Sequence, residues 1–547
     1  MINRFKEALL NREFAITLEL IPGRGANEEA QVKELAEVER IYQTGRVHAV
    51  SITDNPGGNP AILADAVALE LQSRGITTLT HFTCKDRNRN QIASQLYAME
   101  RRGIANLLIM SGDSTNSGWN GCARPVFDLD PVQLLQMVGE MNRGLRVPGA
   151  KKCEQQQQPT HFFAGAVVSP FKWTEAEVHT QYFKLEKKLL SGAQYIITQV
   201  GYDSRKMEEL LCYLRECGYT IPVLANVYLI SVGMARYMKG GNVPGIYISD
   251  EFFEILRQEA KAEDKGKTAR LLRAAKMVTI ARGLGYAGVH IGGLGLNAES
   301  LTHILDVADQ IQARWREWAE ELQYGKPQGF YLYERGAKSE SGSADPAALR
   351  TPLLCTYEKG KKIFRNHGIS RFFHYWVLTR DRRAYGLLEK SMARRELKRG
   401  WDRSHGFEHL GKAVLYGCLD CGDCGLEVTE YNCPMSQCPK CQRNGPCGGS
   451  MNGWCEDYPL KRHCIYFKAY HRLKKFNEVK KLDAFITPPN NWEFFETSGW
   501  GNYTHRRDNA AHRHSLPARG QRADVVDKMQ GVGRTTDNEY FGISQAY

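Results

Sequence analysis

Residues 47–83 read VHAVSITDNPGGNPAILADAVALELQSRGITTLTHFT. Two short β-branched runs, Val47–Thr53 and Thr77–Thr83, flank the segment Ala61–Ser73, whose apolar residues recur with the period of a helix. A strand, a helix and a second strand in this order indicate a parallel βαβ unit. Each further repeat of this alternation along the chain predicts another strand and helix of the same parallel sheet.

The alternation repeats over residues 1–325. The predicted strands are Ala15–Leu20, Val47–Thr53, Thr77–Thr83, Ala105–Ser111, His161–Val168, Gln194–Val200, Pro222–Tyr228 and Ala287–Gly293. Eight such units in about 300 residues fit a (β/α)8 barrel. A doubly wound open sheet is the alternative, but no GxGxxG motif follows the first strand. We expect an α/β fold, a TIM barrel followed by a small cysteine-rich metal-binding domain.

The composition is that of a folded protein with local charge. Of the 547 residues, 42% are hydrophobic and 24% are charged, which is enough to bury ordinary cores. Lys and Arg outnumber Asp and Glu by 14 to 4 in residues 359–403 and by 5 to 1 in residues 505–523, so these two segments carry the net charge of +12. No apolar stretch approaches the ~20 residues of a membrane helix, and the first residues lack a secretory layout. We therefore expect a cytoplasmic protein without membrane contact.

Composition also divides the chain into parts. A stretch rich in Ser and Gly indicates an interdomain linker, which we place at residues 326–358. A basic connector and the cysteine-rich domain follow at residues 359–490. We expect residues 491–547 to form a poorly ordered basic tail.

The cysteines carry the strongest chemical signal. Nine of the 15 lie in the run Cys418-x2-Cys421-x2-Cys424-x8-Cys433-Pro434-x3-Cys438-x2-Cys441-x5-Cys447-x7-Cys455-x8-Cys464. In a cytoplasmic chain, such a density indicates metal ligation more than disulfides. Three cysteines at two-residue spacing favour a [4Fe–4S] cluster, whereas Cys438-x2-Cys441 is equally typical of a zinc knuckle. Nine cysteines could supply two four-ligand sites with one left over.

Polar residues gather where the predicted strands end, which is where (β/α)8 barrels carry their chemistry. They are Glu19, Thr53, Asp54, Asn55, His81, Thr83, Cys84, Asp86, Ser111, Gly112, Asp113 and Gln199. Each of them alone is as well explained as a capping or core residue. Their convergence on one rim predicts a site.

Five of these strand ends resemble a known family. The segments TLELIP (17–22), SITDN (51–55), HFTC (81–84), SGD (111–113) and ITQ (197–199) are similar, in this order, to those of methylenetetrahydrofolate reductases. The resemblance covers residues 1 to about 310. It implies a flavin-bearing (β/α)8 barrel that interconverts 5,10-methylene- and 5-methyltetrahydrofolate. The segments CKDRNR (84–89) and PVFDLD (125–130) resemble most the acetogen-type branch, which works beside a small cysteine-rich protein.

The resemblance assigns roles to single residues. Glu19 matches the general acid that protonates folate N10, so that the five-membered ring opens to an iminium cation, and a carboxyl with a raised pKa can donate this proton near neutral pH. Asp113 matches an aspartate that faces flavin and pterin, and its charge would tune the flavin and favour the cation. Gln199 matches a folate-binding glutamine.

Other matches concern the cofactor. The residues that the resemblance implies as flavin contacts are Thr53, His81, Thr83, Ser111, Gly112, Asp113 and Lys188, the last toward the phosphate-bearing portion. Many relatives have Arg at the position of Ser111, where it helps to hold the cofactor tail. FAD is therefore expected with FMN as the alternative. No nicotinamide site is recognisable, so the electron donor or acceptor stays open.

The cysteine run also resembles a family. NGPCGG (444–449), followed by Cys455 and Cys464, is similar to the cysteine-rich partner of acetogen-type reductases, here fused to the barrel. That resemblance implies the ligands Cys418, Cys421, Cys424, Cys433, Cys438, Cys447, Cys455 and Cys464, with Cys441 as the extra cysteine. A [4Fe–4S] cluster beside the flavin would connect the barrel to an external carrier, whereas zinc would only stabilise the fold.

Partners follow from these interpretations. We expect a tetrahydrofolate substrate and an oligomeric protein, with an acidic electron carrier or an NAD(P)H-linked reductase subunit as electron partner; the basic segment 359–403 would suit an acidic carrier. Aromatic residues interleave with the basic ones there, but no nucleic-acid recognition motif accompanies them. Two alternatives stay open: a metal-binding, nucleic-acid-interacting protein on a degenerate barrel, and a folate or corrinoid methyltransferase barrel.

Overall fold

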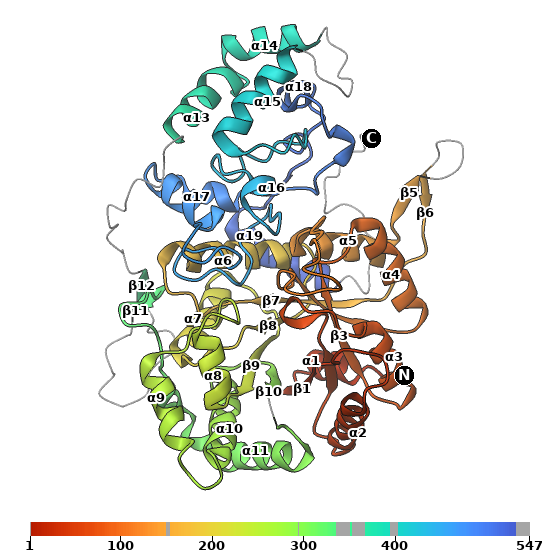
Figure 1. Cartoon of the computed structure of the whole chain (residues 1–547), viewed down its shortest axis with the longest axis vertical. Helices are drawn as coiled ribbons and strands as arrows, with labels where there is room; N and C mark the ends of the chain where they lie inside the picture. Colours follow the sequence, from red (N-terminus) through yellow and green to blue (C-terminus); the bar gives the residue numbers. More distant parts are fainter. Residues whose placement is uncertain are drawn as a thin grey trace.

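The computed structural model describes residues 2–148, 154–293, 295–334, 350–352, 367–393 and 403–531. Two parts stack on each other in Figure 1: a barrel, and above it a helical part that contains the cysteine run. Among the described residues, no helix has the length and apolar content needed to cross a bilayer.

Eight parallel strands form a closed barrel, in the order β1-β10-β9-β8-β7-β4-β3-β2. They are β1 (Ala15–Leu20), β2 (Ala49–Ile52), β3 (Thr78–Thr83), β4 (Asn106–Met110), β7 (Phe163–Val168), β8 (Ile196–Thr198), β9 (Val223–Leu229) and β10 (Gly288–Gly293). Each strand lies within, or within one residue of, one of the eight predicted runs. The predicted (β/α)8 barrel is therefore confirmed.

Helices cover the outside of the barrel. They are α2 (Glu29–Gln43), α3 (Ala64–Ser73), α4 (Arg89–Arg101), α5 (Pro131–Arg143), α6 (Glu175–Leu190), α7 (Ser204–Glu216), α8 (Val232–Lys239), α9 (Asp250–Glu259), α10 (Lys267–Leu284), α11 (Ala298–Ile311) and α12 (Trp315–Glu321). A small hairpin, β5 (Arg146–Pro148) and β6 (Glu154–Gln156), extends from the barrel between α5 and β7. Because helices cover the strands outside and side chains fill the barrel inside, the strands are buried on both faces.

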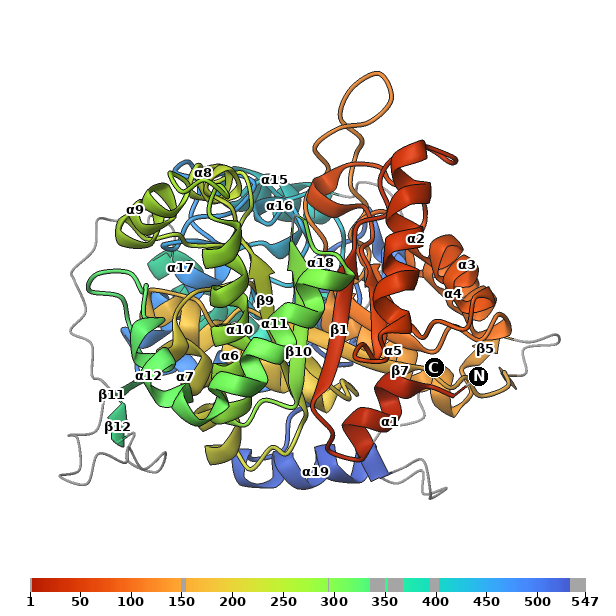
Figure 2. The same ribbon diagram turned by 90° about the horizontal axis from the view of Figure 1, so that it is seen from below.

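Helix α1 (Arg4–Leu10) closes the N-terminal end of the barrel. Its Phe5 and Leu9 belong to a buried cluster with Phe163 and Tyr195, which point into the barrel. The Phe5 ring meets the Tyr195 ring edge-on, with 5.1 Å between centroids. Figure 2 shows α1 below the end of β1. This plug leaves the C-terminal ends of the strands as the place for chemistry.

Helix α6 is the common wall of the two parts. Fourteen of its 16 residues are buried, whereas a helix on the outside of a domain normally exposes one face. Helix α17 (Ile465–Lys474) packs against it, and the Tyr470 hydroxyl donates to Glu175 at 2.9 Å. Helix α19 (Arg519–Gly531) also returns to α6, where Arg522 donates to Glu186 at 2.7 Å.

The helical part is built from short elements around the cysteine run. They are α13 (His367–Phe373), a π-helical turn (His374–Leu378), α14 (Arg383–Ala393), α15 (Arg403–Tyr416), α16 (Pro434–Gln437) and α17, followed by β13 (Phe485–Ile486), α18 (Gly499–Thr504), β14 (His514–Ser515) and α19. The cysteine run extends from the end of α15 to the start of α17. Much of the predicted basic connector is thus helical where the structure describes it.

Two predicted boundaries are corrected. Residues 491–531 are folded rather than disordered, because buried carboxylates of other elements neutralise their arginines: Arg522 pairs with Glu186 and, at 2.8 Å, with Asp483. Residues 532–547 lie outside the described residues. The start of the predicted linker, residues 326–334, packs on the barrel, with Phe330, Leu332 and Tyr333 buried. Residues 335–349 lie outside the described residues.

Candidate functional site

The strand register directs one row of polar side chains into the C-terminal end of the barrel. Glu19 pairs in register with Ser51, Thr17 with His290, and His290 with Asn226. Paired residues of neighbouring parallel strands point to the same face of the sheet. The sequence predicted Glu19 in this row, but it did not single out the other four.

Glu19 lies beside two histidines. Its Oε1 is 3.9 Å from Nε2 of His290, and Nδ1 of His290 is 2.9 Å from Thr17 Oγ1. Nε2 of His81 is 2.8 Å from Ser51 Oγ, and the centroids of the two imidazole rings are 6.2 Å apart. Strands β1, β2, β3 and β10 thus bring a carboxyl and two imidazoles together inside the barrel.

The electrostatics of this cluster differ from the expectation for Glu19. Burial alone would raise its pKa, but the hydrogen bonding and charge of His290, together with the charge of His81, bring the pKa of Glu19 below its ordinary value. The predicted raised pKa is therefore not found. Burial, helped by the charge of His290, lowers the pKa of His81 to about 4, so His81 is neutral at pH 7.

Gly292 makes room for the Glu19 side chain. A Cβ atom on Gly292 would lie 2.4 Å from Glu19 Oε2 and 3.0 Å from Glu19 Cβ. Gly292 is in β10, the strand that also carries His290. Only a glycine at this position leaves the Glu19 carboxylate in its present place.

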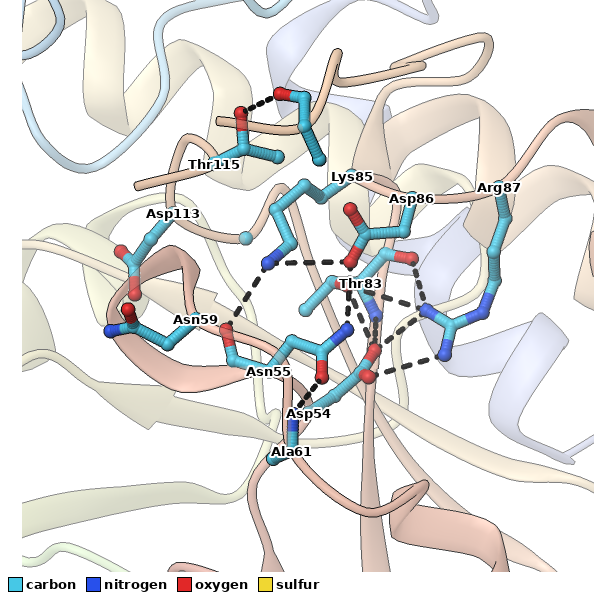
Figure 3. A network of polar contacts seen from close by, with 12 residues as sticks. Asp54, Asn55, Asn59, Ala61, Thr83, Lys85, Asp86, Arg87, Asp113 and Thr115 are labelled. Atoms are coloured by element: carbon cyan, nitrogen blue, oxygen red, sulfur yellow. Dashed lines mark hydrogen bonds and ion pairs between the residues drawn. The ribbon is translucent and has the colours of Figure 1, made fainter. Parts of the chain in front are cut away.

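A second network fixes the ends of β2 and β3 (Figure 3). Asp54 accepts from both Arg87 nitrogens, at 2.7 and 3.1 Å, and from the Thr83 hydroxyl at 2.8 Å. Burial would raise the pKa of Asp54, but Arg87 and Thr83 lower it. Next to it, Asn55 donates to Asp86 at 2.9 Å. The Thr83 hydroxyl is thus bound to the protein scaffold.

The loop after β4 holds the predicted residues 111–113. Asp113 Oδ2 accepts from the Gly57 amide at 2.8 Å. The other two residues of this loop are contacted by the cysteine-rich part: Lys440 Nζ donates to the Gly112 carbonyl at 2.7 Å, and Ser111 Oγ donates to Gln442 Oε1 at 3.2 Å. The cysteine-rich part therefore forms one side of the site. The sequence pattern did not predict this contact.

Two further predicted residues, Gln199 and Lys188, form hydrogen bonds to backbone groups and not to the Glu19 cluster. Gln199 Oε1 accepts from the Val200 amide at 2.9 Å. Lys188 is buried on α6 and donates to the Val167 carbonyl of β7 at 2.5 Å. Burial and the charge of Lys184 lower the pKa of Lys188 to about 7.

Asn226 is a site residue that the sequence reasoning missed. Its Oδ1 is buried and has no hydrogen-bond partner among the described residues. Buried carbonyl oxygens are nearly always paired, so this oxygen is available to accept a hydrogen bond from a bound ligand. Its register with His290 was the signal, and this becomes visible only once the strands are paired.

The eight predicted ligand cysteines divide, by their order in the chain, into an outer and an inner group of four. The outer group is Cys418, Cys421, Cys424 and Cys433, whose side chains line one small cavity. Burial raises the pKa of Cys421, and the charges of the other three members raise it further. None of the described cysteines forms a disulfide.

The inner group is Cys438, Cys447, Cys455 and Cys464, and it lies against α6. Gln181 of α6 donates to the Cys447 carbonyl at 2.7 Å. Burial raises the pKa of Cys447, and the charges of Cys464 and Cys438 contribute to this rise. Burial also raises the pKa of Cys464, and the charge of Cys455 contributes to it. The charge of the ninth cysteine, Cys441, raises the pKa of Cys438 in the inner group. The charge of Cys433, in the outer group, raises the pKa of Cys441. No three His, Cys, Asp or Glu side chains in the described part of the chain converge closely enough to ligate one metal ion.

A closed barrel with a carboxyl, two imidazoles and an unpaired amide oxygen at the C-terminal ends of its strands belongs to the class of (β/α)8-barrel enzymes. Comparison with known proteins identifies the family. The profile described as methylenetetrahydrofolate reductase matches residues 4–309, which is more than half of the chain. The chain belongs to the methylenetetrahydrofolate reductase family. A second profile, described as methylene-tetrahydrofolate reductase C terminal, matches residues 401–493, so both resemblances read from the sequence are confirmed.

Individual relatives are distant. The probable methylenetetrahydrofolate reductase (NADPH) of Caenorhabditis elegans is 22% identical over 231 residues, which are 41% of this chain and 32% of the relative. The probable methylenetetrahydrofolate reductase (NADH) of Oryza sativa is 24% identical over 240 residues, 42% of this chain and 38% of the relative. The chain thus spans about a third of the length of these relatives. A solved structure, described as an uncharacterized protein from Clostridium thermocellum that binds two copies of 5-methyl-5,6,7,8-tetrahydrofolic acid, is 14% identical; the match has a TM-score of 0.41 and covers 56% of this chain and 99% of that one.

Proposed function

We propose that this protein interconverts 5,10-methylenetetrahydrofolate and 5-methyltetrahydrofolate with a bound flavin. The observation that carries the proposal is the pair of Glu19 and His290 inside the barrel of a chain that belongs to this family. The alternatives of a degenerate barrel or a methyltransferase barrel have no comparable support. The family uses FAD.

The residues at the strand ends fit a flavin and a pterin. The unpaired Asn226 oxygen needs a donor. Lys440, which is ion-paired with Glu456, lies at the Ser111 corner, where many relatives have Arg. Thr53, His81, Thr83 and the loop 111–113 would hold the cofactor, Lys188 would neutralise its phosphate portion, and Gln199 would bind the folate. The bound flavin supplies hydride transfer to the folate carbon.

Glu19 would protonate N10, so that the bond between N10 and the methylene carbon breaks and the iminium cation forms. Since the pKa of Glu19 lies below its ordinary value, the carboxyl needs a proton source, and Nε2 of His290 is placed to be one. Folate binding would also exclude water from Glu19, whose side chain is 20% exposed, and thus raise its pKa. The Asp113 charge would stabilise the cation.

For the two cysteine groups, the proposal is [4Fe–4S] clusters, on the strength of the cysteine spacing. Each group offers four thiols, the usual ligand set of such a cluster. Zinc stays the alternative, because a zinc ion takes the same number of thiolate ligands. The clusters would supply one-electron transfer between the barrel and an outside carrier, such as an acidic protein that recognises the basic segment 359–403.

Anaerobic purification of the full chain tests the proposal. We expect a flavin absorbance spectrum, about eight irons and eight sulfides per chain for two clusters, and little zinc. Glu19→Gln should retain flavin but lose turnover of methylene-folate. Full turnover by this variant would overturn the role of Glu19. A colourless protein that binds folate would overturn the flavin and favour a methyltransferase.

A further inference from the structure

The layer of the barrel interior that contains Glu19 also contains an aromatic ring. Tyr228 of β9 pairs in register with Gly292 of β10. On the other side of β10, a Cβ atom on Gly292 would meet the Glu19 carboxylate. Paired residues of neighbouring parallel strands point to the same face of the sheet. Glu19 and Tyr228 therefore face the same space, and the residue between them has no side chain.

Tyr228 faces the inside of the barrel. Leu224, four residues earlier on β9, belongs to the interior cluster that contains Tyr195, and residues two or four apart on a strand share a face. Val227 and Leu229, which point to the outer face of β9, are fully buried, whereas Tyr228 is half-buried. The Tyr228 ring is therefore accessible at the C-terminal end of the barrel.

The backbone around this ring is held by the neighbouring strand. The Tyr202 hydroxyl donates to the Tyr228 carbonyl at 3.1 Å, and the Asn226 amide donates to the Thr198 hydroxyl at 3.0 Å. Burial raises the pKa of Tyr228, and the negative charge of Glu19 raises it further. Tyr228 is thus an uncharged ring on a fixed backbone, close enough to Glu19 to sense its charge.

The strands around Tyr228 are the ones assigned to the folate. Strands β8, β9, β10 and β1 are consecutive neighbours in the closed barrel. Gln199, which follows β8, and Glu19 on β1 are the two residues assigned to the folate. The flavin residues at strand ends belong to β2, β3 and β4, on the other half of the barrel. Tyr228 on β9 therefore lies between the two folate residues.

The substrate carries an aromatic ring on the atom that Glu19 would protonate. N10 bears the p-aminobenzoyl ring, so this ring must lie near Glu19 when the proton is transferred. If the ring and N10 are coplanar, the N10 lone pair is delocalised into the ring and N10 is a weak base. If the ring is turned about its bond to N10, the lone pair stays on N10 and accepts a proton more readily. The orientation of the ring therefore controls proton transfer.

We propose that Tyr228 is a positioning residue, whose ring packs against the p-aminobenzoyl ring and holds it out of conjugation with the N10 lone pair. The inference rests on the proposed function, because it needs a folate at Glu19. In this step the proton moves from the Glu19 carboxyl to N10. The bond between N10 and the methylene carbon then breaks and leaves its electron pair on N10. Tyr228 gains and loses no proton; it changes how readily N10 accepts one.

Rapid-reaction kinetics of the full-length flavoprotein test the inference. Tyr228→Met fills the space of the ring with a flexible side chain. Reoxidation of the reduced flavin by saturating methylene-folate needs N10 to be protonated first, so its rate should fall about tenfold or more. Reduction of the flavin by saturating methyl-folate transfers the hydride before N10 takes part, so its rate should stay at the parental level. A folate that is merely misplaced would slow both reactions.

Two further variants and a substrate fragment complete the test. Tyr228→Phe keeps the ring and should retain the parental rates. Tyr97→Met is the matched control, because Tyr97 is a half-buried tyrosine on the outer helix α4, and it should change neither rate. p-Aminobenzoylglutamate should inhibit the parental protein in competition with methylene-folate. Tyr228→Met should weaken this inhibition by up to about tenfold.

Several outcomes would overturn the inference and leave the proposed function intact. They are parental reoxidation by methylene-folate in Tyr228→Met, an equal loss in both half-reactions, and a loss in Tyr228→Phe, since the hydroxyl would then be the acting group. A parental protein that holds no flavin, or that reacts with neither folate, would instead overturn the proposed function. If Tyr228→Met does not fold, Tyr228→Leu replaces it, and Tyr228→Phe still separates the ring from the hydroxyl.

Discussion

Replacing Gly292 by Ala should displace the Glu19 carboxylate without touching its chemistry. The new Cβ would lie 2.4 Å from Glu19 Oε2, and an ordinary contact would need about 1 Å more. The backbone of Gly292 is not in the left-handed region, so Ala is tolerated there on conformational grounds. The substitution therefore acts through the carboxylate.

The expected loss can be estimated from this displacement. A misplacement of about 1 Å in a reacting group costs on the order of 10²-fold in rate, which corresponds to about 2.7 kcal/mol of activation free energy. We expect kcat for anaerobic oxidation of methyl-folate with a dye acceptor to fall by that factor, while the flavin content stays at the parental level. Overpacking should also reduce the free energy of unfolding by about 1–3 kcal/mol.

Two comparisons make the result decisive. Gly233→Ala places a Cβ on α8 at 3.9 Å from Ser231 Oγ, an ordinary van der Waals distance, and should leave kcat unchanged. Because Gly292→Ala acts through Glu19, the double variant with Glu19→Gln should be no slower than Glu19→Gln alone. Parental kcat in Gly292→Ala, or additive losses in the double variant, would refute the reasoning.

Other predictions test neighbouring features. His290→Gln removes a proton carrier beside the carboxyl, so methylene-folate turnover should fall about 10²-fold, with a changed pH–rate profile and unchanged flavin content. Lys440→Met should weaken flavin binding at least tenfold, about 1.5 kcal/mol, in a flavin titration, and Lys440→Arg should restore it. Arg522→Ala leaves buried Glu186 with fewer partners and should lower the free energy of unfolding by about 3 kcal/mol, as measured by urea denaturation. The pKa of His81 is about 4 in the folded protein, whereas an ordinary histidine has a pKa of 6.5, so between pH 6.5 and pH 4 only the unfolded chain takes up this proton. The free energy of unfolding should therefore fall by about 3 kcal/mol as the pH is lowered from 6.5 to 4. In thermal unfolding, His81→Gln should make that fall smaller.

The barrel could be predicted because each strand carries its own signal. β-branched runs such as Thr77–Thr83 and helical runs such as Ala61–Ser73 depend on local periodicity, and a chain that alternates them eight times has few folds open to it. The position of Glu19 at a strand end followed from the same pattern. The grouping of the cysteines was left open, since spacing alone does not say which four converge.

The rest of the site depends on contacts between distant segments. The pairing of Asn226 with His290, and the approach of Lys440 to Gly112, join residues far apart in the chain, and no local pattern encodes them. The lowered pKa of Glu19 has the same origin, because it is set by a histidine from β10. Residues 491–531 were misjudged because their arginines read as solvated, whereas their partners are buried carboxylates such as Glu186.

The shared wall formed by α6 has a consequence for how such a protein can be assembled. A barrel made alone would present to water the face that α17 and α19 cover, including Phe183 and the carboxylate of Glu186. Two separate chains would therefore have to find each other before either is fully folded. Joining them in one chain adds no contact to that wall, but it raises the effective concentration of one part around the other, typically to the millimolar range. Fusion thus makes the assembly of the two parts independent of how much of each the cell produces.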